Sequence, residues 1–344
     1  MSATGIDGAR SLKALNTLGV DARAAGMIEL VQPEQLADTA FDPRTDLVLG
    51  EGSNVLIADD VPGTVLLNRL RGRRVVEGDG DHALIEAAGG EPWHGLVRWS
   101  LDQGLCGLEN LSLIPGLAGA APMQNIGAYG VELADHLVDL DAWDWRDRQF
   151  RRFTADECRF GYRDSHFKTG EPDRYLVTAI RLRLSRRLTP RLDYPGLAAA
   201  LADASVDQPT ARDVSDAVIR VRRAKLPDPA TIGNAGSFFR NPVVDAGLAD
   251  DLRTRFDGLP VYPAGDGRAK LSAGWMIEHC GWKGHRDGDA GISEKHALVL
   301  VNHGAASGRE LVELAWRVRD SVAETFGVVL ENEPRIVEFP RQHD

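Results

Sequence analysis

Short apolar runs and alternating apolar and polar positions predict most of the strands in this chain. The runs consist mainly of Leu, Val and Ile, and Pro62-Gly63 marks a break between two of them. A strand is also expected to begin at Ala83. The other predicted strands are Leu47–Leu49, Val55–Ala58, Thr64–Leu67, Leu137–Trp145, Leu176–Leu184, Ala297–Asn302 and a closing strand over 328–339.

Apolar residues at helical spacing predict helices between these strands. A short helix is expected within 188–203, and amphipathic helices over about 93–101, 213–225 and 308–326. The helix over 213–225 should be capped by Asp213 or Ser215 and stopped by Pro227 and Pro229. The proline-marked stretch Lys225–Pro229 is the main predicted domain boundary. The mixture of elements predicts an α+β fold.

Composition and charge exclude several classes of protein. With 344 residues, the chain is long enough for two or three domains with buried cores. A formal net charge of −11 disfavours a nucleic-acid partner, because phosphate backbones need basic surfaces. No apolar run approaches the roughly 20 residues of a membrane span, and the N-terminal residues lack the apolar core of a secretory signal.

The cysteines and histidines predict neither disulfides nor a metal centre. Cys106, Cys158 and Cys280 are odd in number and widely spaced, so we expect free thiols in a reducing cytoplasm. The histidines show no helix-spaced pair of metal ligands, so no metal site is expected.

The segment Gly104–Gly130, called the ribbon below, is a candidate cofactor site. It is dominated by small residues, and Glu109 is its only charged residue. Glycine and alanine let a backbone approach another body closely and adopt positive φ. The N–H groups of such a backbone suit a large anionic cofactor. A glycine-rich surface loop is the alternative.

The loop Gly50–Asn54 (GEGSN) is a second candidate. Gly50 and Gly52 match the first two glycines of a dinucleotide-binding fingerprint. Val55 occupies the third glycine position, and the loop leads into a strand where that motif requires a helix. Two interpretations remain: a strand–loop–strand phosphate cradle, with Ser53 and Asn54 as side-chain donors, and a plain hairpin turn.

Ser237 lies in GNAGSFFRNP (Gly233–Pro242), within a Gly/Asn-rich segment, Ile232–Asn241, that is predicted to be a loop. Its two phenylalanines should order this loop. No nucleophile motif surrounds the serine. A turn or cap residue is therefore one interpretation, and proton donation to a carbanion is the other.

Charged residues suggest further chemistry. In FGYRDSHFK, Arg163 lies among aromatic residues, where its planar group could bind a carboxylate; a surface ion pair is the alternative. Glu331 and Glu333 are expected on one face of the closing strand by its two-residue period. Solvated edge carboxylates are the alternative there, and the preferred one for Glu331. The phosphate candidates are Arg222, Arg223, Lys225, Lys283 and Arg286.

Several segments, taken in order, resemble one family. They are ALNTLGV, LVLGEGSNVLI, ENLSLIPGLAGAAPMQNIGAYG, ECRFGYRDSHFK, AKLPDP, GNAGSFFRNP and KLSAGWMIE, and they span nearly the whole chain. Together they closely resemble the UDP-N-acetylenolpyruvoylglucosamine reductase family, flavoproteins of peptidoglycan precursor synthesis. The resemblance implies an FAD-binding fold of the PCMH or vanillyl-alcohol-oxidase type with two α+β subdomains (1–72 and 73–226). A C-terminal α+β substrate-binding domain (227–344) follows, whose last strand returns towards the flavin.

The resemblance also implies an activity. NADPH would reduce a non-covalently bound FAD, and the enolpyruvyl ether of UDP-N-acetylglucosamine would then take hydride from flavin N5 and a proton. The product would be UDP-N-acetylmuramate. A monomeric, cytoplasmic oxidoreductase is expected, with neither a nucleic-acid nor a membrane partner, and with roles in cell wall biogenesis, cell shape and cell division.

Residue roles follow from the same resemblance. The implied catalytic residues are Arg163, Glu333 and, as proton donor, Ser237. The implied FAD contacts are Gly50, Glu51, Gly52, Ser53, Asn54, Ile114, Pro115, Gly116, Gly119, Ala120, Asn125, Gly127 and Tyr129. The implied substrate contacts are Tyr162, Tyr194, Lys225, Asn241, Lys283 and His296. We expect Gly52→Asp to lose FAD, because a carboxylate there would face the pyrophosphate and the added side chain would clash.

Two positions depart from the family pattern. His296 stands where the family commonly has glutamine, and Asn332 stands where proline is frequent. We expect Asn332 to loosen the strand end while leaving Glu333 in place.

Two alternative functions are compatible with parts of the sequence. One is an oxygen-using alcohol or lactone oxidase of the same fold with a covalently tethered flavin, for which Cys106 would be the candidate. Release of all yellow colour on acid precipitation would exclude a tether. The other is a UDP-sugar-binding module without chemistry, which the joint presence of Arg163, Ser237 and Glu333 disfavours.

Overall fold

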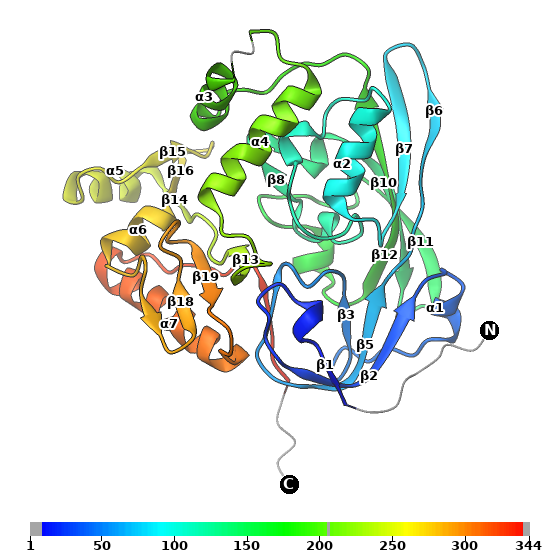
Figure 1. The fold of residues 1–344 in the computed structure, drawn as a ribbon, viewed down its shortest axis with the longest axis horizontal. Coiled ribbons are helices and arrows are strands. Elements are labelled where there is room, and N and C mark those ends of the chain that lie inside the picture. The colour runs from blue at the N-terminus through cyan, green and yellow to red at the C-terminus, as the bar shows by residue number, and fades with distance from the viewer. Residues whose placement is uncertain (1–8, 205–206, 340–344) are drawn as a thin grey trace. The chain divides into compact units, whose positions relative to one another are not determined.

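The computed structural model describes residues 9–204 and 207–339, which form two units. Unit 1 comprises the described residues up to Arg10, Ala24–Glu51 and Val61–Ala224. Unit 2 comprises Ser11–Arg23, Gly52–Asp60 and the described residues from Lys225 onward. The boundary at residue 225 coincides with the proline-marked stretch, whereas the division into three domains at 72 and 226 stays a prediction. Figure 1 labels the elements of both units.

Unit 1 is built on two larger sheets. One has the order β1-β2-β5-β3, with β5 parallel to both β2 and β3. The other is antiparallel, with the order β11-β10-β12-β7-β6. The strands are β1 (Arg10–Ser11), β2 (Arg23–Leu30), β3 (Leu47–Leu49), β5 (Val61–Asn68), β6 (Arg73–Gly78), β7 (His82–Ala88), β10 (Leu137–Asp144), β11 (Gln149–Thr154) and β12 (Tyr175–Ser185). A short pair, β8 (Gly127–Ala128) and β9 (Val131–Glu132), lies within and just after the ribbon.

The α-helices described in unit 1 pack in different places. They are α1 (Gln35–Asp38), α2 (Trp93–Asp102), α3 (Pro195–Asp203) and α4 (Ala211–Lys225). Helices α3 and α4 share an apolar core of their own. The predicted apolar face of α2 buries Trp93, Leu96 and Val97 in one core with Ile85 and Ile180 of the sheet. Each such buried side chain stabilises the fold by roughly 1.5–3 kcal/mol. Figure 1 shows α4 lying beside α2.

Unit 2 combines small sheets with three helices among its described residues. Its sheets have the orders β13-β19-β18-β17 and β14-β16-β15, and β4 pairs in parallel with β20. The strands are β4 (Val55–Ile57), β13 (Gly233–Ser237), β14 (Val243–Asp245), β15 (Val261–Pro263), β16 (Arg268–Leu271), β17 (Arg286–Asp287), β18 (Ala290–Ile292), β19 (Val299–Asn302) and β20 (Arg335–Val337). The helices are α5 (Ala246–Arg255), α6 (Ala273–His279) and α7 (Gly308–Phe326).

Four local predictions are wrong, each for a physical reason. Pro62-Gly63 lies inside β5, because the irregular register between β2 and β5 falls at these residues, where proline is tolerated. Helix α4 begins at Ala211, because Thr210 and Asp213 exchange hydrogen bonds and Thr210 takes the cap position. The segment expected as a loop at 232–241 contains β13, because its backbone pairs with β19. The closing strand is shorter than predicted and begins at Arg335, because the chain bends at Glu333 and Pro334.

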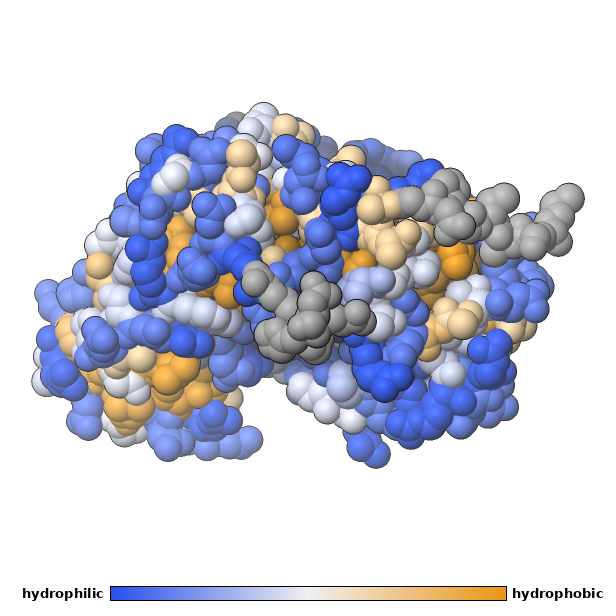
Figure 2. All heavy atoms as spheres, turned by 90° about the horizontal axis from the view of Figure 1, so that it is seen from below, coloured by the Kyte–Doolittle hydropathy of each residue, from blue (hydrophilic) through white to orange (hydrophobic). Residues whose placement is uncertain are grey.

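On the face shown in Figure 2, hydrophilic side chains predominate and hydrophobic ones appear as separate patches. Among the helices of residues 9–204 and 207–339, none combines the length and the apolar character that a membrane crossing requires.

Candidate functional site

The ribbon of unit 1 is anchored to the residues that precede α2. The N–H of Trp93 donates to the Gly116 oxygen at 2.9 Å, and the N–H groups of Ala118 and Gly119 donate to Glu91 and Gly89, each at 2.8 Å. A Cβ on Gly119 would lie 2.7 Å from the Val177 oxygen, so only glycine fits. Residues 116–119 are buried. The alternative of a surface loop is therefore wrong for this part of the ribbon.

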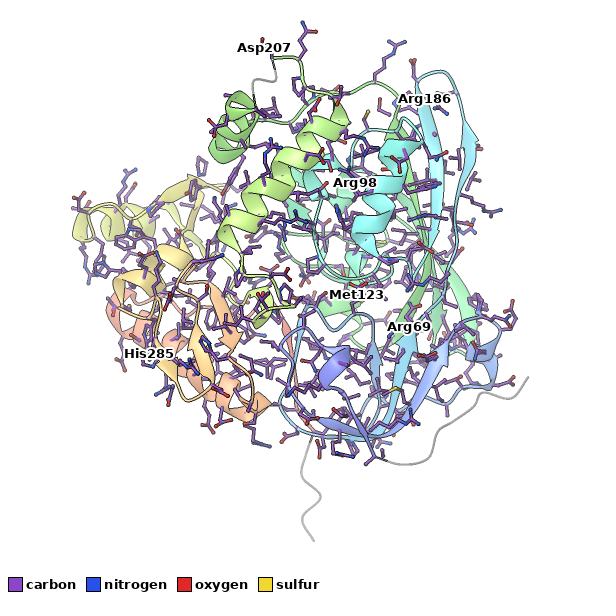
Figure 3. All side chains as sticks on the ribbon, viewed as in Figure 1. Arg69, Arg98, Met123, Arg186, Asp207 and His285 are labelled. Carbon is purple, nitrogen blue, oxygen red and sulfur yellow. The ribbon has the colours of Figure 1, made fainter. Side chains whose placement is uncertain are left out.

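A buried polar network fixes the ribbon just before this anchor. The hydroxyls of Ser112 and Ser215 lie 2.7 Å apart, and both residues are fully buried. Arg98 donates to Ser215 at 3.0 Å and to Asp216 at 2.6 Å. Figure 3 shows Arg98 where α2 and α4 lie side by side. The N–H of Leu113, the next residue along, donates to Nδ1 of His94 at 2.9 Å.

The GEGSN loop crosses from one unit to the other. Its first half belongs to unit 1, where the carboxylate of Glu51 accepts the Gly116 N–H at 3.0 Å. Strand β3 before the loop and strand β4 after it belong to different sheets. Since a hairpin requires its two strands to pair, the hairpin alternative is wrong.

The second half of the loop is tied into unit 2. The Gly52 oxygen accepts the Thr17 N–H at 3.1 Å, and Gly52 has φ +61°. A Cβ at Gly52 would overlap the Leu15 oxygen and lie 2.6 Å from Cα of Asn16. The expected clash of Gly52→Asp thus has a definite cause in the structure, and it applies to alanine as well. The expected repulsion from the pyrophosphate stays a prediction.

Arg163 is directed by the ribbon. Its Nη2 donates to the Gly127 oxygen at 2.7 Å, and a Cβ on Gly127 would lie 3.1 Å from Arg163 Nη1. The guanidinium carbon lies 5.4 Å from the centre of the Tyr162 ring, and Tyr162 is 38% exposed. Arg163 itself has φ +55°, an uncommon conformation for a residue with a side chain. Such a strained residue is a candidate for function.

The side chain of Asn125 is hydrogen-bonded to other residues of the protein. Its amide nitrogen donates to Glu132 at 2.7 Å and to the Gly161 oxygen at 3.2 Å, while its Oδ1 accepts the Ala134 N–H at 3.0 Å. Its φ is +45°, which asparagine tolerates. The side chain is thus occupied within the protein, and Asn125 contributes to the site by shaping the ribbon.

Tyr129 of the ribbon and Tyr194 before α3 lie together in unit 1. Their rings are 4.9 Å apart, edge to face. Burial raises the pKa of the Tyr129 hydroxyl, with the nearby Arg222 acting in the opposite direction. Tyr194 is 41% exposed. Two residues assigned to different ligands by the resemblance are thus neighbours.

In unit 2, a bulge presents Ser237 at the end of β13. Asn234 pairs with Val301 and Ser237 with Val299, so β13 carries one extra residue. Gly236 takes φ +72°, and its N–H donates to Asn234 Oδ1 at 3.1 Å. Such bulges re-aim a side chain. Among the described residues, none is hydrogen-bonded to the Ser237 hydroxyl.

Glu333 lies against the same segment. Its N–H donates to the Phe238 oxygen at 2.7 Å, and Phe239 is bridged to Asn332. The expectation that Glu331 and Glu333 share a strand face is wrong, because both precede β20. The amide of Asn332 donates to the Pro334 oxygen at 2.7 Å, and the expected loosening of the strand end stays a prediction. Asn241 Oδ1, nearby in sequence, accepts the Ala273 N–H at 3.0 Å.

His296 lies in a positively charged environment within unit 2. Burial lowers the pKa of His296, and the charges of Lys225 and Lys283 lower it further against a smaller opposing effect of Glu278. Nδ1 of His296 accepts the Leu298 N–H at 3.2 Å, so the neutral ring carries its proton on Nε2. Lys283 pairs with Glu278 at 2.9 Å.

Sequence analysis missed His94, Ser112 and Ser215. His94 and Ser215 lie within predicted amphipathic helices, where a polar residue beside the apolar face is most often solvated, and Ser112 lies among the small residues of the ribbon. No local signal distinguished them, because their hydrogen bonds join residues that are distant in the sequence.

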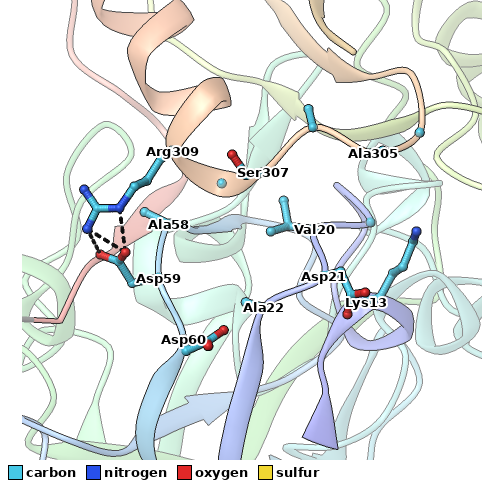
Figure 4. Close-up of a pocket in the computed structure, with 14 residues that line it drawn as sticks. Lys13, Val20, Asp21, Ala22, Ala58, Asp59, Asp60, Ala305, Ser307 and Arg309 are labelled. Carbon is cyan, nitrogen blue, oxygen red and sulfur yellow. Dashed lines mark hydrogen bonds and ion pairs between the residues drawn. The ribbon is translucent and has the colours of Figure 1, made fainter. Parts of the chain in front are cut away.

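Unit 2 also contains a pocket that is separate from the predicted site residues. Figure 4 shows a pocket of about 410 Å³ in unit 2, lined by Asp21, Asp59, Asp60 and the residues around the start of α7. None of the predicted site residues lines it. In the described part of the chain, no group of three His, Cys, Asp or Glu residues could hold a metal ion.

The loop and the ribbon carry donors that fit an anionic cofactor. Within residues 9–204 and 207–339, no oxygen accepts the N–H groups of Gly52, Ser53 or Ile114, and Gly52 is buried. Buried backbone donors normally have partners. Uncommitted N–H groups suit phosphate oxygens. The donors of each unit are therefore of the kind that FAD requires.

Comparison with known proteins decides the family. The family model for an FAD binding domain matches residues 43–151, and the one for the UDP-N-acetylenolpyruvoylglucosamine reductase C-terminal domain matches residues 228–337. The Pseudomonas aeruginosa protein named UDP-N-acetylenolpyruvoylglucosamine reductase is 51% identical over 95% of this chain and 97% of its own length. This chain belongs to the UDP-N-acetylenolpyruvoylglucosamine reductase family.

Other members of the reductase family agree. The Pseudomonas putida protein of the same name is 48% identical over 95% of this chain and 97% of its own length. The crystal structure of the reductase from Thermus caldophilus covers 99% of this chain and all of its own, with a TM-score of 0.68 and 28% identity. Like these reductases, the chain is an oxidoreductase. The expected α+β fold, an FAD-binding domain followed by a C-terminal domain of this family, is confirmed.

Proposed function

We propose that this chain reduces the enolpyruvyl ether of UDP-N-acetylglucosamine to UDP-N-acetylmuramate, with NADPH as reductant, as a cytoplasmic step of peptidoglycan precursor synthesis. Family membership supports the substrate. One observation in unit 2 carries the chemistry: the Glu333 N–H donates to the oxygen of Phe238, the residue after Ser237. This bond brings the segments that carry the Ser237 hydroxyl and the Glu333 carboxyl group next to each other.

FAD, when bound, supplies the two-electron redox chemistry, accepting hydride from NADPH and delivering it to the methylene carbon of the substrate. The uncommitted N–H groups of Gly52, Ser53 and Ile114 are the proposed phosphate donors. Glu51 is proposed to act indirectly, because its carboxylate accepts the Gly116 N–H and so holds the ribbon. We propose non-covalent binding, since burial and the charge of Glu109 raise the pKa of the Cys106 thiol and so disfavour its reactive thiolate.

Arg163 is proposed to neutralise the substrate carboxylate. Hydride addition to an enolpyruvyl group pushes negative charge into that carboxylate, giving an enediolate-like intermediate. The bond to Gly127 and the Tyr162 ring restrain the guanidinium before substrate arrives. A preorganised donor of this kind is worth roughly 3–4 kcal/mol in a site that excludes water.

Ser237 is proposed to protonate the carbon next to the carboxylate. A serine hydroxyl is a weak acid, so the step requires a strongly basic carbon and a well-aimed donor. The bulge at Gly236 and the buried Phe238 and Phe239 supply the aim. Glu333 is proposed to share a hydrogen bond with the developing charge on the carboxylate.

The remaining polar residues are proposed to bind the UDP-sugar. Lys225 and Lys283 are proposed to provide positive charge for the diphosphate. Asn241, which follows Ser237 closely in the sequence, is proposed as a further contact of the UDP-sugar, as are Tyr162 and Tyr194 of unit 1. Neutral His296 would offer an Nε2–H donor, which is what the side-chain amide of glutamine offers at this position in the family. The substitution thereby keeps a donor.

An anaerobic experiment tests the proposal. Purified protein reconstituted with FAD should lose its yellow colour when NADPH is added and regain it when the enolpyruvyl substrate follows. Acid precipitation should release all of the flavin. Bleaching without recovery of colour would refute the proposed substrate, and recovery with oxygen alone would favour an oxidase.

A further inference from the structure

One of the contacts between the first turn of α2 and the ribbon is made by a histidine. Nδ1 of His94 accepts the N–H of Leu113 at 2.9 Å. Leu113 has φ +58°, a left-handed conformation that costs a residue with a side chain roughly 1–2 kcal/mol. A local contact must offset this strain. On one side of Leu113 stands the buried Ser112–Ser215 hydrogen bond, and on the other the backbone leads into Ile114.

The conformation of Leu113 orients the next peptide group. The N–H of Ile114 belongs to the peptide whose direction the ψ angle of Leu113 sets. Among the described residues, none accepts this N–H, and Pro115 after it has no N–H to offer. If Leu113 left the left-handed region, the Ile114 N–H would point elsewhere. The hydrogen bond that His94 accepts from Leu113 therefore sets the direction of the Ile114 N–H.

The surroundings keep His94 neutral. Burial lowers its pKa, and the positive charges of Arg98 on α2 and of Arg223 and Arg222 on α4 lower it further, with Asp216 on α4 acting in the opposite direction. A neutral ring that accepts at Nδ1 carries its proton on Nε2. A protonated ring would have donors at both nitrogens and could not accept the Leu113 N–H.

We propose that His94 is a positioning residue for the cofactor: by accepting the Leu113 N–H, its neutral ring holds the ribbon in the conformation that binds FAD, and protonation of the ring releases it. The inference rests on the proposed role of the ribbon in FAD binding. It assigns His94 no contact with substrate and no part in the chemistry.

The sign of the pH dependence follows from the direction of the shift. A histidine with a lowered pKa is neutral above its ordinary value of 6.5, where the bond to Leu113 is fully available. As the pH falls below that value, folding free energy is lost because the unfolded chain takes up a proton that the folded chain does not, and the loss ends where the folded protein is itself protonated. FAD affinity should fall at that lower, acidic end, where the ring of the folded protein takes up its proton.

The test is an FAD titration of the full chain, followed by flavin fluorescence from pH 8 to pH 5. His94→Ala removes the acceptor and should weaken FAD binding roughly tenfold at pH 7.5, as expected for one buried donor left without a partner. His94→Asn keeps an acceptor that does not titrate, and should bind FAD within about threefold of the original chain. His82→Ala, at an exposed histidine of β7 in the same unit, is the matched control.

The ratio of the dissociation constants of the original chain and His94→Asn is decisive. It should rise as the pH falls below 6.5 and remain flat above it, since other titrating groups affect both proteins alike. A flat ratio, or an Asn variant as weak as the Ala variant with an unchanged melting temperature, would overturn the inference. Failure of the original chain to bind FAD at any pH would instead refute the proposed function.

Discussion

The ribbon in unit 1 and the Ser237 segment in unit 2 (Gly233–Asn241) are both rich in glycine, yet their glycines serve different purposes. Gly119 of the ribbon lies where a Cβ would meet the Val177 oxygen and the Gly89 backbone. Gly236 has open space around its Cβ position, but its φ is +72°. The first glycine permits close packing, and the second permits a backbone conformation.

The two segments also use their polar groups differently. Most N–H groups of 113–119 are bonded within the protein, so the ribbon is a rigid support with few free donors, Ile114 among them. The Ser237 segment is rigid in its Phe238 and Phe239 side chains and leaves the hydroxyl uncommitted among the described residues. A support that holds a cofactor needs fixed backbone, whereas a proton donor needs a free functional group on a fixed backbone.

The sharpest test of this difference is Ser237→Ala. NADPH oxidation delivers no proton to substrate carbon, so anaerobic flavin reduction should be nearly unchanged. Reoxidation by the enolpyruvyl substrate should slow by roughly 10²–10⁴-fold, the usual effect of a lost general acid. Stopped-flow absorbance of the flavin measures both rates.

Ser237→Cys serves as the companion variant, because a thiol is more acidic and still donates. It should keep more activity than the alanine variant. Equal losses in both half-reactions would indicate a displaced flavin or a disturbed segment, and normal reoxidation in Ser237→Ala would move the proton to another donor.

The second prediction separates Arg163, held by the ribbon, from Lys225 in unit 2. Arg163→Ala should lower kcat roughly 10²–10³-fold, because the charge it meets develops during the reaction. Lys225→Ala should mainly raise KM for the UDP-sugar, since a diphosphate is charged throughout. Steady-state kinetics decide the matter; a change confined to KM in both variants would contradict the assigned roles.

The third prediction concerns the packing of the ribbon. Gly119→Ala should destabilise unit 1 by about 1–3 kcal/mol and lower the melting temperature by roughly 3–10 °C, because backbone atoms must shift. FAD binding should weaken with it. Gly95→Ala in α2 is the control, since its Cβ would find only ordinary contacts and alanine favours a helix. Equal melting temperatures for the two variants would refute the packing explanation.

The smallest effect is expected at Gly236. Alanine there adds roughly 1–2 kcal/mol of left-handed strain without a clash, and should slow flavin reoxidation several-fold by shifting Ser237. Gly236→Asn should be milder, because asparagine tolerates this region. If the alanine variant reoxidised normally while losing stability, the bulge would be structural only.

Local signals in the sequence predicted much of this molecule. Helix α7 lies over the predicted residues, because Ser307 and Glu310 form a capping box and Gly327 ends the helix with φ +70°. The buried face of α2 and strands β3 and β12 follow from apolar spacing in the same way. Such elements depend on neighbours a few residues away.

The failures arise where distant segments meet. The predicted closing strand is interrupted by a bend at Glu333 and Pro334, and Asn332 before this bend pairs with the distant Phe239, a contact that local periodicity does not reveal. The GEGSN loop looked compatible with a hairpin until its strands proved to have different partners. The order of the motifs predicted the candidate site residues. It did not predict His94, whose role depends on the hydrogen bond that it accepts from Leu113.

The pairing of β4 with β20 has a consequence for synthesis. Asn54 and Glu333, whose side chain and backbone meet at 3.5 Å, are 279 positions apart. At about 5–20 residues per second, a ribosome needs roughly 15–55 s between them. Throughout that time the edge of β4 has no partner strand in its sheet, which exposes it to wrong pairing. Unit 2, which carries Ser237, can close only when the late strand emerges.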